Sequence, residues 1–169
     1  MISKKMAEYL NQQVNLEFYS SNIYLQMSAW AETNSLPGTA AFLKKQAAEE
    51  MMHMMKIFDY INESDHMAII GKIDSPATNY KSLEDLFKKV YAHEQHVTKK
   101  IHEIAELAWK EKDLTTFNFM QWYITEQHEE ETQAKGILDK IDLIGNDRRA
   151  LFLVDRELGS MALTEPSNQ

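Results

Sequence analysis

The sequence predicts an all-α protein: a four-helix bundle with one long crossover and a short fifth helix at the C-terminus. Three observations lead to this prediction. Only 5 Gly and 3 Pro occur in 169 residues, fewer turn residues than a β-rich fold requires. Four long stretches place apolar residues at steps of three and four, the spacing of one helix face. The first and third connections between these stretches are short and the second is long, and these lengths determine whether successive helices run antiparallel or parallel.

The first two helices are predicted at residues 4–34 and 38–66. Asn34, Pro37 and Gly38 interrupt the apolar pattern between them, and these residue types favour turns. Because only a few residues separate the two stretches, the helices should run antiparallel.

Residues 67–80 form the predicted crossover, since they contain Gly71 and Pro76 and lack a sustained helical stripe. About 14 residues extend to roughly 46 Å at ~3.3 Å per residue. A helix of about 28 residues is roughly 42 Å long. The crossover can therefore travel the length of a helix, so that the third helix starts parallel to the second.

The third helix is predicted at residues 82–111 and the fourth at 114–143. Ser82-Leu-Glu-Asp85 has the form of a capping box, in which two side chains satisfy the free N–H groups of a helix start. Asp113 is the predicted N-cap of the fourth helix, and Gly145 ends it.

A short fifth helix is expected at residues 147–160, followed by a polar tail that ends TEPSNQ. We therefore expect one helical domain at 1–163 and a C-terminal tail at 164–169. A chain of 169 residues is long enough for one domain with a core of its own.

Composition excludes several classes of function. The absence of Cys excludes disulfides, thiolate metal sites and thiol catalysis. A net charge of −8 without a basic stripe argues against nucleic acid as a partner and makes cations plausible ones. No apolar run reaches the length of about 18 residues that a membrane span needs. A cytoplasmic protein with no membrane partner is therefore expected.

In each long helix a side chain able to bind metal interrupts the apolar stripe near the middle of the helix. Mid-helix positions meet at one level of a bundle, whether the helices run parallel or antiparallel. We therefore expect six side chains to converge in the interior: Glu17, Glu50, His53, Glu94, Gln127 and Glu130.

Buried carboxylates at one level need a counter-charge, because an isolated buried anion is very unfavourable. No Lys or Arg lies on these stripes near that level, whereas divalent cations would supply the charge. Carboxylates with one imidazole and no sulfur suit iron, manganese and, less well, zinc. Glu50 and His53 form a Glu-x-x-His pair on one helix face, a motif of di-iron carboxylate bundles. The sequence thus predicts a metal centre, with iron as the expected metal.

Other interpretations apply to the neighbouring residues. The charge runs at 49–50 and 126–131 are equally typical of solvated helix faces. Tyr24 follows Glu17 by one heptad and is either a core tyrosine bonded to a metal ligand or an electron donor. The expected core fillers and packing residues, rather than haem ligands or redox relays, are Met51, Met52, Met54, Met55, Trp30 and Trp122. The expected surface residues are His66, His93, His96, His102 and His128.

Four motifs resemble those of prokaryotic non-haem ferritins, and the resemblance covers nearly the whole chain. They are Asn15-Leu-Glu-Phe-Tyr-Ser-Ser21, Glu49-Glu50-x-x-His53, Phe117-Asn-Phe-x-Gln-Trp-Tyr123 and Glu126-Gln-His-Glu-Glu130. The resemblance implies a ferritin-like fold and a ferroxidase centre. In it the first iron would be held by Glu17, Glu50 and His53.

By the same resemblance Glu94 would hold the second iron, with Glu50 bridging and Gln127 nearby. Glu130 would lie between the second iron and a third iron site. That third site would use the remaining acidic residues of these motifs, which are Glu49, Glu126 and Glu129. Tyr24 matches the tyrosine that the family carries beside the centre.

The family also implies a hollow shell of twenty-four subunits, with the fifth helix lining fourfold axes. Bacterioferritins and rubrerythrin-like proteins carry a second Glu-x-x-His on the last long helix, where this chain has Gln127-His128-Glu129-Glu130. Met51 follows Glu50 as the haem-binding methionine does in bacterioferritins, but non-haem ferritins also tolerate Met there, so no haem is expected. The mini-ferritins of starved cells fit less well, because they lack the ligand set within a single bundle.

The expected function is iron storage, with Fe(II) oxidised by dioxygen or peroxide and Fe(III) kept as a mineral core. Two alternatives belong to other classes. One is a di-metal oxidase or peroxidase that acts on a small molecule without storage, and the other is a purely structural bundle.

Overall fold

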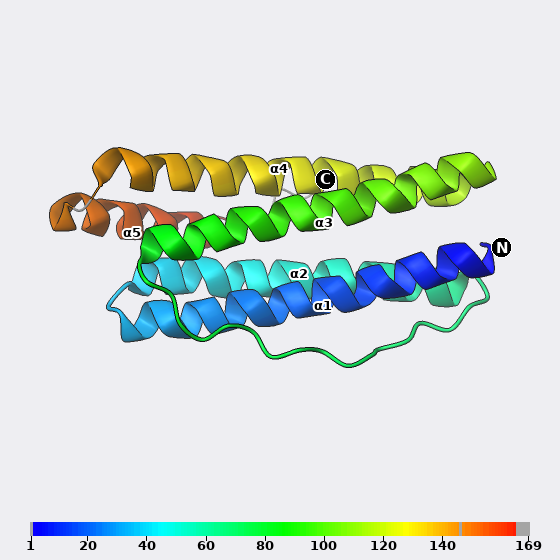
Figure 1. Ribbon diagram of the computed structural model, residues 1–169, viewed down its shortest axis with the longest axis horizontal. Coiled ribbons are helices and arrows are strands. Elements are labelled where there is room, and N and C mark those ends of the chain that lie inside the picture. Colours follow the sequence, from blue (N-terminus) through cyan, green and yellow to red (C-terminus); the bar gives the residue numbers. More distant parts are fainter. Residues whose placement is uncertain (1, 146, 165–169) are drawn as a thin grey trace.

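The structure, a computed structural model, describes residues 2–145 and 147–164, and this part of the chain contains five helices. They are α1 (Lys4–Thr33), α2 (Pro37–Glu63), α3 (Leu83–Glu111), α4 (Leu114–Ile144) and α5 (Arg148–Ala162). α1 packs against α2 and α3, α3 packs against α4, and α5 packs against α2 and α4. The result is a four-helix bundle with a short fifth helix at one end (Figure 1), which confirms the predicted fold class.

The crossover between α2 and α3 runs along the outside of the bundle from one end to the other (Figure 1). Two asparagines of α1, one turn apart, hold its backbone. Asn11 Oδ1 accepts the N–H of Ile69 at 2.6 Å, and Asn15 Oδ1 accepts the N–H of Gly71 at 2.6 Å. Asn15 Nδ2 also donates to the carbonyl of Ile69 at 2.8 Å. Because the crossover spans the bundle, α3 starts at the same end as α2 and runs parallel to it, as predicted.

Capping contacts confirm three predicted helix ends. Ser82 Oγ accepts the N–H of Asp85 at 3.1 Å, and Asp113 Oδ1 accepts the N–H of Thr116 at 3.0 Å. Gly145 follows the last residue of α4 with a φ of 56°, a conformation that glycine adopts without strain.

Other boundaries differ from the prediction. The capping box is modified, because Asp85 Oδ2 accepts the N–H of Lys81 at 3.0 Å instead of that of the capping serine. α2 ends at Glu63 instead of residue 66, and Asp65 just beyond it has a φ of 60°, outside the helical range. α5 continues two residues further than predicted, to Ala162.

Apolar side chains form two clusters on either side of a polar layer. In α1, Leu10 and Val14 belong to one cluster and Tyr24 belongs to the other, while the buried Glu17 lies between them. In α2, Leu43 and Ile57 are divided in the same way. The two clusters hold the helices together on both sides of the charged level, so the bundle can tolerate buried carboxylates there.

Asp155 attaches α5 to the N-terminus of α2. Its Oδ1 accepts the N–H and the hydroxyl of Thr39, each at 2.7 Å, and its Oδ2 accepts the N–H of Gly38 at 3.1 Å. The N-cap residue of α2, Leu36, makes no side-chain cap of its own. A Cβ on Gly38 would lie 1.9 Å from the Asp155 carbonyl oxygen, so only glycine fits here. The carboxylate thus caps α2 from a distant part of the sequence.

The predicted tail falls almost entirely outside the described residues, since 165–169 are not described. The division into a domain at 1–163 and a tail at 164–169 therefore stays a prediction. None of the helices within the described ranges combines the length and the apolar character needed to cross a membrane.

Candidate metal centre

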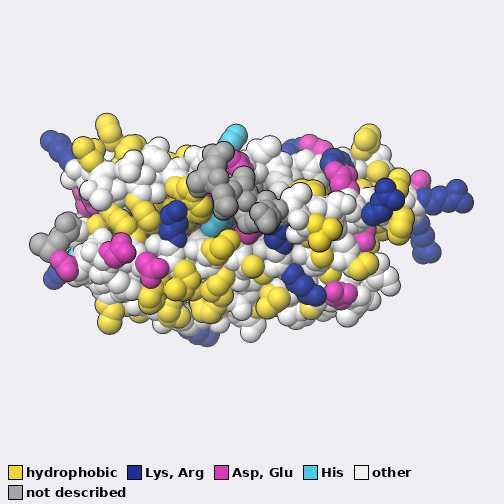
Figure 2. Space-filling view, turned by 180° about the vertical axis from the view of Figure 1, so that it is seen from behind, with side chains coloured by type: hydrophobic (Ala, Val, Ile, Leu, Met, Phe, Trp, Pro, Cys, Tyr) yellow, Lys and Arg dark blue, Asp and Glu magenta, His cyan; other side chains and the backbone are white. Residues whose placement is uncertain are grey.

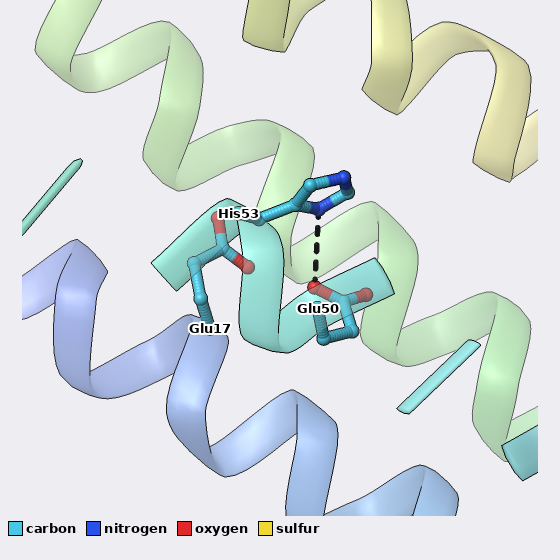
Figure 3. Close-up of side chains that lie close together, drawn as sticks. All are labelled: Glu17, Glu50 and His53. Carbon is cyan, nitrogen blue, oxygen red and sulfur yellow. Dashed lines mark ion pairs between the residues drawn. The ribbon is translucent and has the colours of Figure 1, made fainter. Parts of the chain in front are cut away.

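Glu17 of α1 and Glu50 and His53 of α2 meet in the polar layer. All three are buried, with no more than 6% of any residue exposed. One ligand atom from each lies within 4.8 Å of the others, and the side chains point toward one another (Figure 3). His53 Nδ1 lies 3.4 Å from Glu50 Oε2. The spacing of i and i+3 on α2 puts this imidazole and carboxylate on one face, as the sequence analysis expected.

A second group joins α2 to the other half of the bundle. Ligand atoms of Glu50, Glu94 of α3 and Glu130 of α4 also lie within 4.8 Å of one another. Glu130 Oε1 is 3.9 Å from His53 Nδ1, which brings the two groups together. Glu50 belongs to both groups, so its carboxylate can bridge two adjacent cations.

Three carboxylate oxygens of this layer are buried without a hydrogen-bond partner among the described residues: Glu17 Oε2, Glu50 Oε2 and Glu130 Oε2. Such an unpaired buried oxygen costs about 1–3 kcal/mol, and more when it is charged. Carboxylate oxygens with one neutral imidazole match the ligand preference of iron or manganese. The donor set and its unpaired oxygens therefore fit divalent cations.

Burial raises the pKa of each of these carboxyl groups. The pKa of Glu17 rises to about 7 through loss of hydration, a rise that the hydrogen bond from Gln13 opposes. Burial and then repulsion from the surrounding carboxylates hold the pKa of Glu50 and of Glu130 well above the ordinary value. Burial therefore favours the protonated form of these carboxyl groups when no cation is bound, and a bound cation would displace the protons.

His53 is held in the form that binds metal. Burial, and then the nearby Lys56, lower its pKa to about 4, so the ring is neutral at physiological pH. Trp122 packs edge-on against it with ring centroids 5.3 Å apart, and Lys56 Nζ lies 3.8 Å from the centre of the Trp122 ring. The Tyr123 hydroxyl donates to the His53 carbonyl at 2.8 Å. The Trp122 ring thus packs against the imidazole, while Tyr123 holds the backbone of α2 at this position.

Tyr24 and Gln127 both contact Glu94. Gln127 Nε2 donates to Glu94 Oε2 at 2.5 Å and to the Glu94 carbonyl at 3.2 Å, and the Tyr24 hydroxyl donates to Glu94 Oε1. Both hydrogen bonds lower the pKa of Glu94, whereas burial raises it more strongly. Tyr24 is thus a core tyrosine bonded to a candidate ligand, and its role as an electron donor stays a prediction.

Glu49, Glu126 and Glu129 lie beside the centre in a looser arrangement. Among the described residues they form no group tight enough to hold one ion. Burial raises the pKa of Glu49 and of Glu126, and Glu129 and Glu49 raise that of Glu126 further. Lys45 Nζ lies 3.7 Å from Glu49 Oε1, a cation that the sequence analysis did not anticipate. The third site therefore stays a prediction.

Sequence reasoning missed two residues around the centre. Gln13 Nε2 donates to Glu17 Oε1 at 2.8 Å, and its position one turn before Glu17 on the same face could have revealed it. His93 was expected on the surface, but it is only half-exposed. Its Nε2 lies 2.7 Å from Ser20 Oγ, its ring packs edge-on against Tyr24, and burial lowers its pKa to about 4. Position 93 borders the buried face of α3, so its neighbours cover the ring.

Comparison with known proteins gives one consistent result. The family model described as "Ferritin-like domain" matches residues 7–144. A probable bacterial non-haem ferritin-like protein of Haemophilus influenzae is 49% identical over 162 residues, which cover 96% of this chain and 98% of that protein. A bacterial non-haem ferritin of Escherichia coli is 46% identical over 161 residues, covering 95% and 98%.

The fold comparison agrees. A crystal structure of an open pore ferritin from the archaeon Archaeoglobus fulgidus superposes with a TM-score of 0.93 at 42% identity. The match covers 98% of this chain and all of that one. With a matching family model, relatives near half identical over almost their whole length, and the same fold, the chain belongs to the ferritin family, among the bacterial non-haem ferritins.

Proposed function

We propose that this protein stores iron: it oxidises Fe(II) at the buried centre and keeps the Fe(III) as a mineral inside a hollow homo-oligomeric shell. One observation carries the proposal. Two groups of ligand atoms share Glu50, and three of their carboxylate oxygens have no partner among the described residues. A purely structural bundle would have no use for these unpaired buried carboxylates, because they destabilise it.

In the proposed reaction Fe(II) is the substrate. Glu17, Glu50 and His53 would bind one ion, and Glu94 with Glu50 would bind the other, with Glu130 and Gln127 beside it. Anionic oxygen ligands bind Fe(III) more strongly than Fe(II), so this ligand set favours loss of an electron from each ion. Two neighbouring ions can together supply the two electrons that convert dioxygen to hydrogen peroxide. Either dioxygen or peroxide is therefore a suitable oxidant.

The carboxyl groups, the Gln127 amide and a pocket beside the centre each affect how iron would bind and leave. The carboxyl groups must release protons for Fe(II) to bind, which makes binding stronger as pH rises. Gln127 presents a neutral amide at a position where a carboxylate would bind Fe(III) more tightly. Fe(III) should therefore leave the second metal position more easily. A narrow pocket lined by Gln46, Glu94, Glu130 and Gln133 reaches the centre between α2 and α4. Glu49, Glu126 and Glu129 do not line this pocket, so the route by which iron would reach the proposed third site stays a prediction.

Storage also requires a closed shell, and we propose twenty-four subunits on the strength of the family. Exposed apolar side chains support an assembly, because such side chains are usually covered by a partner. On α5 the exposed fractions are 64% for Phe152 and 57% for Leu153. The view from behind the bundle shows hydrophobic side chains spread along much of its length (Figure 2). A cytoplasmic location belongs to the same proposal.

Two measurements test the function together. The mass in neutral solution should correspond to a large shell of 19.7 kDa subunits, and aerobic Fe(II) should be oxidised rapidly as followed by near-ultraviolet absorbance. Glu50→Ala and His53→Ala should abolish the fast phase, whereas Glu63→Ala, on the exposed end of α2, should not.

The alternatives predict other results. A monomer or dimer that oxidises Fe(II) would replace storage by the di-metal oxidase. A protein that neither binds nor oxidises iron would leave the structural bundle. Parent rates in the double variant Glu50→Ala/His53→Ala would place the reaction elsewhere in the molecule.

A further inference from the structure

Gln13 holds one particular oxygen of Glu17. Its side chain lies in α1 one turn before Glu17, and only 1% of the residue is exposed. Its Nε2 donates to Glu17 Oε1 at 2.8 Å, while Glu17 Oε2 has no partner among the described residues. The two oxygens of this carboxylate are therefore in different situations before any cation arrives.

The hydrogen bond favours the ionised carboxylate and limits how it can bind. A donor to a carboxylate is a charge-assisted hydrogen bond, stronger than one between neutral groups. It directs one lone pair of Oε1 toward the amide, away from the centre. A cation that binds without breaking this bond finds both lone pairs of Oε2 available but only one of Oε1, so binding through Oε2 alone is favoured. One-oxygen binding takes fewer coordination positions and leaves room for the oxidant and for Glu50.

Gln13 also separates the centre from a pocket on the outside of the bundle. A cavity of about 170 Å³ lies between α1 and α3 and is lined by Gln12, Gln13, His96 and Lys100, among others. Gln12 is exposed and lines the same cavity, but it is not bonded to Glu17. The two adjacent glutamines share the cavity and differ in the contact with the carboxylate, which makes Gln12 a matched control.

We propose that Gln13 is a positioning residue of the metal centre, which by holding Glu17 Oε1 favours Oε2 as the oxygen through which Glu17 binds a divalent cation. This inference rests on the proposed metal centre and deepens it. It predicts that the amide acts through its N–H group and not through its volume.

The test replaces Gln13 by Met, which has a similar length and shape but no donor, and compares it with Gln12→Met. Co(II) is titrated under nitrogen, followed by calorimetry and by visible absorption, which reports the number and arrangement of ligand atoms. Removing the partner of a metal ligand typically weakens metal binding by about 10–100-fold, so we expect at least tenfold weaker binding of the first Co(II) in Gln13→Met. Its visible spectrum should also change, whereas Gln12→Met should match the parent. In Fe(II) oxidation Gln13→Met should raise KM more than it lowers kcat.

Each other outcome has a definite meaning. Parent affinity and an unchanged spectrum in Gln13→Met would overturn the role of Gln13 while leaving the centre intact. An equal loss in Gln12→Met would also overturn it, because the packing of the cavity would then be responsible. A parent protein that binds no Co(II) would refute the proposed centre itself. If Gln13→Met does not fold, Gln13→Leu replaces it. Failure of both to fold would overturn the proposal in favour of a structural requirement for the amide.

Discussion

Replacing Glu17 by Gln should stabilise the metal-free protein at neutral pH, by an amount that depends on pH. Glu17 is buried, and loss of hydration raises its pKa from 4.5 to about 7. Below pH 4.5 the Glu17 carboxyl is protonated in both the folded and the unfolded state, so its raised pKa does not change the free energy of unfolding. Between 4.5 and about 7 the unfolded chain releases the proton and the folded protein keeps it. Stability is therefore lost as pH rises through this interval.

The structure sets the size of the effect. The interval from 4.5 to about 7, at ~1.36 kcal/mol for each pH unit, corresponds to on the order of 3 kcal/mol. Gln at position 17 has no proton to lose and still offers an oxygen to the Gln13 amide. The free energy of unfolding of Glu17→Gln should thus exceed that of the parent by a margin that grows to this value near pH 7 and then levels off.

The assay is guanidinium unfolding of metal-free protein in a chelating buffer, at one protein concentration and several pH values between 5 and 8, followed by circular dichroism. Glu8→Gln on the exposed face of α1 is the control and should follow the parent at every pH. With Co(II) added the order should reverse, because the ion stabilises only the protein that binds it well. A difference between Glu17→Gln and the parent that does not vary with pH would refute the reasoning. So would a less stable variant.

Three further predictions test other parts of the molecule. Glu49→Ala with Glu126→Ala should keep the initial oxidation of two Fe(II) per subunit but change the iron oxidised per dioxygen consumed, measured with an oxygen electrode. Unchanged stoichiometry would make these residues a solvated acidic patch. Asp155→Asn should lower the free energy of unfolding by about 1–3 kcal/mol, because the N-terminus of α2 loses a charged acceptor; denaturant curves that coincide with the parent would exclude such a cap. Tyr24→Phe should weaken binding of the second Co(II) by about tenfold, since Glu94 loses a hydrogen-bond donor. If calorimetry gives the variant and the parent the same affinity for Co(II), the contact between Tyr24 and Glu94 has no role in metal binding.

Much of this protein follows from local rules that can be applied to the sequence alone. Helix periodicity and helix-ending residues depend on neighbours within a turn or two, so the five helices and the caps at Ser82 and Asp113 were predictable. The length of the crossover limits where α3 can start, and this set the topology. Burial at mid-helix positions follows from the same periodicity. For that reason the sequence alone predicts that Glu17, Glu50 and Glu94 lie at one level.

Tertiary structure alone decided which atoms meet at that level. The periodicity of α3 does not reveal that Tyr24 and Gln127 contact Glu94, because that depends on the rotation of α1 and α4 about their axes. Asp155 could not be predicted as the cap of α2, since 116 residues separate it from Thr39. Packing between helices determines which side chains far apart in sequence come into contact. Helix periodicity and capping motifs within one helix do not predict that packing.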